Sequence, residues 1–279
     1  MKYEFVKMEG CGNDYVYIDA FKYKVDDPVT LAKKISDVHF GVGSDGLILV
    51  APSDKADGRM IMFNLDGSEG RMCGNGIRCV GKFMYDRLGI KKETITVETK
   101  SGIKTLKMFA ENGKATAARV DMGKAILTPS LIPVRLEGET VIDREVNIDG
   151  NEYKITCVSM GNPHAVVFTD NVESLELDKI GPKFEHNELF PESVNTEFVE
   201  VRDRTHLRMR VWERGSGETW ACGTGTCATV VAACLNGYCD KGSDVEVELN
   251  GGFLTINYTD DTVLMTGPCN DIFEGEIDI

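Results

Sequence analysis

The sequence lacks the features that commit a chain to nucleic acid or to a membrane. Its formal net charge is −14 over 279 residues and it has no long basic run, whereas nucleic-acid binding needs a basic surface. It also has no run of about 18 apolar residues, the minimum for a membrane-spanning helix. The segment from Met1 to Glu9 carries charges and offers no apolar signal core. We therefore expect a cytoplasmic protein.

Histidine is scarce, and cysteine pairs with metal-binding spacing are missing. The four histidines are scattered, and no Cys-x-x-Cys pair occurs among the nine cysteines. An odd number of cysteines in a chain of this length favours reduced thiols, most of them buried, over a disulfide framework. We therefore expect neither a metal site nor structural disulfides.

What the chain does have is one internal repeat. Met72-Cys73-Gly74-Asn75-Gly76 is matched by Ala221-Cys222-Gly223-Thr224-Gly225, and the two cysteines are 149 residues apart. Gly12-Asn13 and Gly161-Asn162 recur at the same offset, each before an apolar run. A fixed offset over several motifs indicates two copies of one structural unit. Folding alone requires neither a cysteine nor an asparagine at these positions, so their presence in both copies points to function.

The repeat extends to the secondary structure that we expect. Val97, Glu98, Gly102 and Thr105 recur 150 residues later around a second turn, which is a β-hairpin pattern in each copy. The helix after each cysteine is apolar on most faces and is therefore expected to be buried. Pro28 suits the first turn of a helix. The predicted helices are Val29–Val38, Gly74–Leu88, Leu175–Phe184 and Gly223–Asn236.

These elements predict an α/β (α+β) protein of two pseudo-symmetric halves. Each half is expected to be a curved, mostly antiparallel sheet around a central helix. We assign residues 1–122 to the first half and residues 123–267 to the second, with 268–279 as a candidate return to the first half. The active site is expected in the crevice between the halves.

The cysteines at the two helix starts carry the predicted chemistry. The thiolate is the reactive form of cysteine, and the positive end of a helix favours an anion, so we expect lowered pKa values for Cys73 and Cys222. The same N–H groups bind a carboxylate, and glycines allow the backbone to approach it closely. One thiolate removes a proton from a carbon and an opposite thiol returns one, which inverts the stereocentre without a cofactor.

Other roles for the cysteines remain open at this point. The generic alternative is that both cysteines are ordinary core thiols, although both lie at helix starts among glycines. A redox pair lacks the usual short spacing. A single nucleophilic cysteine would need a base, for which His164 is a candidate, and would leave the second cysteine without a role.

The order of these motifs resembles the diaminopimelate epimerase family over essentially the whole chain. The resemblance rests on seven segments in order. They are Gly10–Tyr15, His39–Gly46, Phe63–Glu69, Arg71–Cys79, Gly161–His164, Val194–Phe198 and Glu213–Gly225.

The resemblance implies a diaminopimelate epimerase-like fold and cofactor-independent interconversion of LL- and meso-2,6-diaminopimelate, for lysine and peptidoglycan-precursor synthesis. It implies a homodimer with a small-molecule substrate, no nucleic acid and no membrane partner. Cys73 and Cys222 would be the catalytic base and acid, and His164 and Glu213 would tune their pKa values. The implied substrate-binding residues are Asn13, Asn64, Gly74, Asn75, Asn162, Asn195, Glu213, Arg214, Gly223 and Thr224.

The chemistry of these residue types fits a diamino diacid. Arg214 can form two parallel hydrogen bonds to the distal carboxylate, and asparagine amides can contact both a carboxylate and an ammonium group. One position departs from the family pattern, because Gly46 stands where many relatives carry an orienting glutamine. Ser44 or a water is a candidate replacement for that contact.

Other functions remain as alternatives. A proline racemase or 4-hydroxyproline epimerase of the same fold would also use two cysteines, but it resembles a Met-Cys-Gly-His-Gly pattern, whereas this chain has Asn75. A non-catalytic amino-acid binding protein and a thiol redox sensor belong to different classes. Replacing Cys73 by alanine separates them, because a binding protein keeps its ligand and a two-base enzyme loses turnover.

Overall fold

The computed structural model describes residues 2–278, which divide into two compact units. The first unit comprises Met1–Asp121 with Thr266–Ile279, and the second comprises Met122–Met265. No helix in the described part of the chain is long and apolar enough to cross a membrane.

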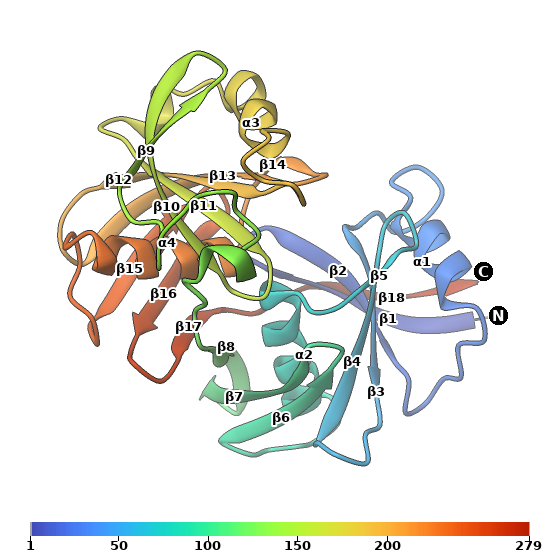
Figure 1. Ribbon diagram of the computed structural model, residues 1–279. Helices are drawn as coiled ribbons and strands as arrows, with labels where there is room; N and C mark the ends of the chain where they lie inside the picture. Colours follow the sequence, from blue (N-terminus) through green and yellow to red (C-terminus); the bar gives the residue numbers. More distant parts are fainter. Residues whose placement is uncertain (1, 279) are drawn as a thin grey trace. The chain divides into compact units, whose positions relative to one another are not determined.

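The first unit is a sheet with two helices. Its strands are β1 (Lys2–Gly10), β2 (Asn13–Asp19), β3 (Gly46–Ala51), β4 (Gly58–Asn64), β5 (Glu69–Gly70), β6 (Thr94–Thr99), β7 (Gly102–Glu111), β8 (Lys114–Gly123) and β18 (Asn270–Asp278). Its helices are α1 (Pro28–Ser36) and α2 (Gly74–Asp86). β18 pairs antiparallel with β1, although the two strands come from opposite ends of the chain (Figure 1).

The second unit repeats this order. Its strands are β9 (Arg144–Ile148), β10 (Asn151–Ser159), β11 (Pro163–Phe168), β12 (Asn195–Val201), β13 (His206–Glu213), β14 (Gly217–Thr219), β15 (Asp244–Leu249), β16 (Gly252–Tyr258) and β17 (Val263–Pro268), which runs past the unit boundary. Its helices are α3 (Leu177–Glu185), α4 (Gly223–Leu235) and the short 3₁₀ turns Pro129–Leu131 and Val172–Ser174.

The first parallel strand pair of each unit has the same register. β2 is parallel to β3 with Val16 opposite Leu47, and β11 is parallel to β12 with Ala165 opposite Thr196. Both members of the second pair lie 149 residues after those of the first. β4 with β6 and β13 with β15 are parallel as well. Antiparallel pairing joins β1 with β18, β1 with β2, β3 with β4, β6 with β7, β7 with β8, β9 with β10, β10 with β11, β12 with β13 and β15 with β16. The predicted α/β fold of two similar, mostly antiparallel halves is therefore confirmed.

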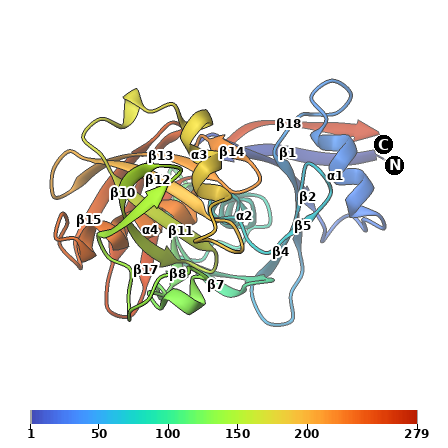
Figure 2. The ribbon, with the colours of Figure 1, turned by 45° about the horizontal axis from the view of Figure 1, so that its top comes forward.

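Each sheet wraps one central helix. α2 packs against β1, β2, β3, β4, β6 and β7, and α4 packs against β10, β11, β12, β13 and β16. Figure 2 shows α4 among β10, β11 and β12. A helix that contacts strands on most sides must bury most of its surface, and residues 74–84 of α2 are all buried. The predicted burial is confirmed, but the buried set of α2 includes the cations Arg78 and Lys82.

Local sequence explains where the smaller helix begins. Pro28 occupies the first turn of α1, as predicted, where its missing N–H is not needed. The side chain of Asp27 caps this turn by accepting a hydrogen bond from the N–H of Thr30 at 3.0 Å. The apolar face of α1, with Leu31 and Ile35, then joins the core of the first unit.

Candidate active site

Cys73 occupies the N-cap position of α2. Its backbone is extended, and its sulfur accepts a hydrogen bond from the N–H of Gly76 at 3.3 Å. The first N–H groups of a helix have no partner within the helix, so the sulfur satisfies one of them. Cys73 is half-buried, whereas Cys222 is buried. The cysteine of the first unit is therefore the more accessible of the two.

Asn13 is brought to Cys73 by a tight turn between β1 and β2. Cys11 and Gly12 both have positive φ, at 57° and 81°, which is the geometry of a two-residue hairpin turn of type I′. The Cys73 thiol donates to Oδ1 of Asn13 at 3.2 Å. The amide Nδ2 of Asn13 donates in turn to Asp45 at 2.6 Å, which fixes the orientation of the amide.

Asp45 is a site residue that the sequence did not indicate. Its carboxylate accepts from the side chain of Asn13 and from the N–H of Asp14. Burial, and next the negative charge of Asp14, raises the pKa of Asp45 above its ordinary value. The carboxylate therefore acts on Cys73 indirectly, by holding Asn13.

Gly46 leaves no space for the glutamine expected from the family pattern. A Cβ atom at this position would lie 2.1 Å from the carbonyl oxygen of Phe63 and 2.9 Å from Cε1 of Tyr15. The hydroxyl of Ser44, the suggested replacement, donates to the carbonyl of Gly46 at 2.9 Å. Asn64, which lies opposite Gly46 on β4, donates to Ser68 at 2.9 Å.

The first turn of α2 also holds Gly74 and Asn75. Their backbone N–H groups belong to the first turn, as the prediction requires, but the side chain of Asn75 is occupied. Its Oδ1 accepts from the guanidinium of Arg78 at 3.1 Å, and the same nitrogen donates to the carbonyl of Gly74 at 3.1 Å. Arg78 therefore fixes this turn from inside the unit.

Cys222 occupies the N-cap position of α4 and lies close to the other predicted residues of its unit. Its sulfur is 3.6 Å from the hydroxyl of Thr224, and Nδ2 of Asn162 is 3.3 Å from the same hydroxyl. Gly223 follows as the first residue of the helix. Cys222, Thr224 and Asn162 thus form a connected group in the second unit.

His164 lies in this group and has a buried carboxylate partner. Its Nε2 is 3.1 Å from Oδ1 of Asn162, and its Nδ1 is 2.7 Å from Oε1 of Glu197. Both His164 and Glu197 are fully buried. A Cβ atom at Gly225 would meet Oε1 of Glu197 at 2.5 Å, so the glycine lets the carboxylate reach the first turn of α4.

Asn195 and the end of β13 complete the predicted set. The amide of Asn195 donates to the carbonyl of Pro163 at 2.9 Å and accepts from the N–H of Arg214 at 3.1 Å. The guanidinium of Arg214 is exposed and donates to the carbonyl of Glu192 at 2.8 Å. Glu213 instead accepts from the hydroxyl of Thr219 at 2.5 Å, so the two neighbouring side chains have different partners.

The expected lowering of the Cys222 pKa is wrong. Burial, and next the charges of Glu213 and Glu197, raises the pKa of Cys222 well above that of a free thiol. Hydrogen bonds from Thr224 and from the N–H of Gly225 act in the predicted direction, but desolvation outweighs them. Burial also raises the pKa of Glu213. Cys222 is therefore a neutral thiol at neutral pH.

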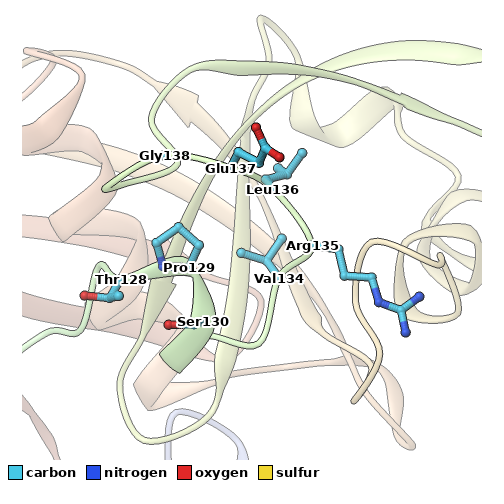
Figure 3. Close-up of a pocket in the computed structure, with 8 residues that line it drawn as sticks. All are labelled: Thr128, Pro129, Ser130, Val134, Arg135, Leu136, Glu137 and Gly138. Atoms are coloured by element: carbon cyan, nitrogen blue, oxygen red, sulfur yellow. The ribbon is translucent and has the colours of Figure 1, made fainter.

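A surface hollow of about 420 Å³ lies elsewhere in the second unit. Figure 3 shows its lining, which comes from residues 128–138 and includes Pro129, Val134 and Arg135. Within the described part of the chain, its lining contains no residue of the cysteine motifs. The hollow therefore gives no support for a substrate site.

Comparison with known proteins identifies the family. The model of the diaminopimelate epimerase family matches residues 5–128 and 156–272. A diaminopimelate epimerase of Agathobacter rectalis is 55% identical over 285 residues, covering 99% of each chain. One of Acetivibrio thermocellus is 54% identical, covering 99% of this chain and 98% of the other. The chain belongs to the diaminopimelate epimerase family.

Solved structures of low sequence identity share the fold of this family member. A hydroxyproline epimerase from Agrobacterium vitis superposes with a TM-score of 0.71 at 13% identity, covering 99% of this chain and 91% of the other. A phenazine biosynthesis protein of the PhzF family from Bacillus anthracis gives 0.68 at 18% identity, with full coverage of both chains. At such identity the likeness concerns the fold alone.

Sequence reasoning missed two carboxylates that this epimerase-family chain places beside the predicted residues. Asp45 holds Asn13, and Glu197 contacts His164. A signal existed for Glu197, because it is the lone acidic residue in the buried stretch Asn195–Val199 and lies two residues after Asn195 on the same strand face. Asp45 lies in a loop between a helix and a strand, where an acidic residue carries no such signal.

Proposed function

We propose that this chain is a cofactor-independent epimerase that interconverts LL-2,6-diaminopimelate and meso-2,6-diaminopimelate. One observation carries the proposal: a chain of the diaminopimelate epimerase family has a cysteine at the N-cap of the buried helix in each of its two repeats. An amino-acid substrate agrees with the names of the relatives.

Cys73 and Cys222 serve as the two acid–base groups on one α-carbon. In one direction, the Cys73 thiolate takes the α-proton and the electron pair passes to the adjacent carboxylate as an enediolate. The Cys222 thiol then gives its proton to the opposite face of the carbon, leaving Cys73 as the thiol and Cys222 as the thiolate. The raised pKa of Cys222 supports its role as the initial acid in this direction.

The hydrogen bonds around the cysteines support the roles of Cys73 as the base and Cys222 as the acid. Asn13 accepts from Cys73 and is itself held by Asp45, so the sulfur has a fixed position. The N-terminal N–H groups of α2 and α4 are suited to the carboxylate at the reacting carbon, where negative charge develops. Of the predicted binding residues, Arg214 has an exposed guanidinium, which suits it to the distal carboxylate.

The decisive experiment is incubation with meso-diaminopimelate in deuterated water. We expect the wild-type enzyme to form the LL isomer with deuterium at one α-carbon, and to do so after dialysis against a chelator. Cys73→Ala and Cys222→Ala are each expected to lower turnover by at least about 100-fold. Cys234→Ala, which changes a half-buried cysteine of α4 outside the repeated motif, is the matched control and is expected to retain turnover.

Three outcomes would contradict the proposal. Isotope exchange that survives both cysteine substitutions would exclude the two-base chemistry. Equal turnover of L-proline would favour a racemase of the same fold, and binding of diaminopimelate without exchange would favour a binding protein. The homodimer, the cytoplasmic location and the role in lysine and peptidoglycan-precursor synthesis stay predictions, and sedimentation analysis of the purified chain tests the first.

A further inference from the structure

The internal repeat gives each residue of the site a counterpart in the other unit. Tyr15 precedes His164 by 149 residues, the same offset that separates Cys73 from Cys222. The register agrees, because Val16 pairs with Leu47 on parallel strands as Ala165 pairs with Thr196. Tyr15 therefore has the place in the first unit that His164 has in the second.

The neighbours of the two residues differ in a complementary way. His164 pairs with Asn195 on the adjacent strand, and the counterpart of Asn195 is Gly46. The larger ring of Tyr15 covers Gly46, where an added Cβ would lie 2.9 Å from Cε1 of the ring. In the second unit, the smaller ring of His164 thus lies beside the amide side chain of Asn195. In the first unit, the larger ring of Tyr15, which bears a hydroxyl, lies beside a glycine.

Tyr15 is buried, at 5% exposure, and lies beside Cys73. Burial, followed by the negative charges of Cys73 and Asp45, raises the pKa of Tyr15 well above its ordinary value, and a hydrogen bond with Cys73 acts in the same direction. A phenol with a raised pKa keeps its proton throughout the working pH range. The hydroxyl is therefore a permanent donor next to the sulfur.

We propose that Tyr15, whose ring covers Gly46, is a positioning residue for Cys73. The Tyr15 hydroxyl shares a hydrogen bond with the Cys73 side chain, and the N–H of Gly76 donates to the Cys73 sulfur at 3.3 Å. A donor to the sulfur favours the thiolate. Asn13, whose Oδ1 accepts from the thiol, favours the protonated form. These opposed contacts keep Cys73 able both to give and to accept a proton. This inference rests on the proposed function.

The test compares Tyr15→Phe, which removes only the hydroxyl, with Tyr3→Phe, which changes a buried tyrosine of the neighbouring strand β1. The first readout is the pH dependence of Cys73 alkylation by iodoacetamide, resolved by peptide mass spectrometry. This measurement requires no substrate. Loss of a donor to the thiolate is expected to move the midpoint of alkylation upward by about one pH unit in Tyr15→Phe, with no change in Tyr3→Phe.

The second readout is turnover of diaminopimelate across pH. We expect Tyr15→Phe to lower kcat by about tenfold at neutral pH, with little change in KM, and to shift the ascending limb of the profile to higher pH. An unchanged alkylation midpoint would overturn the inference, even if kcat fell. Failure of the wild-type enzyme to turn over diaminopimelate would instead count against the proposed function, while the alkylation result still decides the role of Tyr15.

Discussion

At the scale of single residues, equivalent glycines in the two repeats meet different neighbours. Gly76 and Gly225 are the third residues of α2 and α4 and lie 149 residues apart. A Cβ at Gly76 would meet the terminal carbon of Ile48 at 2.8 Å, which is the far end of a flexible side chain. A Cβ at Gly225 would meet Oε1 of Glu197 at 2.5 Å, and that carboxylate is buried and bonded to His164.

This difference predicts unequal effects of the same substitution. We expect Gly225→Ala to lower the free energy of unfolding by about 1–3 kcal/mol, because the carboxylate must leave its partner or the helix must shift. Gly76→Ala, the matched control, is expected to be close to neutral, since alanine favours a helix by up to about 1 kcal/mol over glycine. Urea unfolding measures both. Equal destabilisation of the two variants would contradict the proposed crowding at Glu197.

The same residues show what the sequence could and could not predict. The structure places Cys73, Asn13, Cys222 and Asn162 at the helix ends and turns where repeated polar residues had indicated a site. Glu197 contacts His164 because β11 and β12 pair in parallel with one particular register. That register follows from which faces of the two strands are buried, so the contact itself could not be predicted from the repeated polar motifs alone.

At the scale of elements, α2 is stabilised by buried charge as well as by apolar packing. Nε of Arg78 donates to the carbonyl of Pro268 at 3.0 Å, which connects the helix to the C-terminal segment of the same unit. Lys82 donates to Asp86 at 2.8 Å and to the carbonyl of Ala115 at 2.7 Å. The prediction of a buried helix was right, but the sequence pattern gave no reason to expect these cations in the interior.

The bonds of Arg78 predict a large effect of its removal. Arg78→Met leaves the carbonyls of Pro268 and Gly74 without this donor, and we expect the free energy of unfolding to fall by about 3 kcal/mol. Arg78→Lys is expected to recover little, because an ammonium group cannot span the same acceptors. Arg59→Met, at an exposed position, is the control. Full stability of Arg78→Lys in thermal unfolding would count against this account.

Local sequence predicted the starts of three of the four expected helices. α1, α2 and α4 begin within one residue of their predicted starts, because Pro28 and the two Cys-Gly motifs fix those starts. α3 was expected to begin at Leu175 and begins at Leu177. A 3₁₀ turn, Val172–Ser174, precedes it, and Leu175 adopts an extended conformation that interrupts the helical pattern. Such a break depends on backbone packing rather than on composition.

At the scale of the whole molecule, buried thiols connect the stability of the fold to pH. Burial raises the pKa of Cys157 and of Cys269 to about 12, and each is 1% exposed. In the unfolded chain a thiol ionises near pH 8.5. The neutral thiol is thus favoured by the folded state, so its contribution to stability is fully present below about pH 8.5 and is lost as the pH rises toward 12.

Replacing one thiol isolates this contribution. Above pH 8.5 the free energy of unfolding of the wild-type chain is expected to fall relative to that of Cys157→Ala by about 1.4 kcal/mol per pH unit, because the alanine variant has no group to ionise at this position. The cavity left by the substitution lowers stability by a constant amount and does not alter the slope. Lysine and tyrosine groups titrate equally in both proteins, so the difference between two urea-unfolding series from pH 8 to 10 removes their effect. Parallel curves would mean that Cys157 ionises as readily in the folded chain as in the unfolded one, which its burial in the core of the second unit argues against.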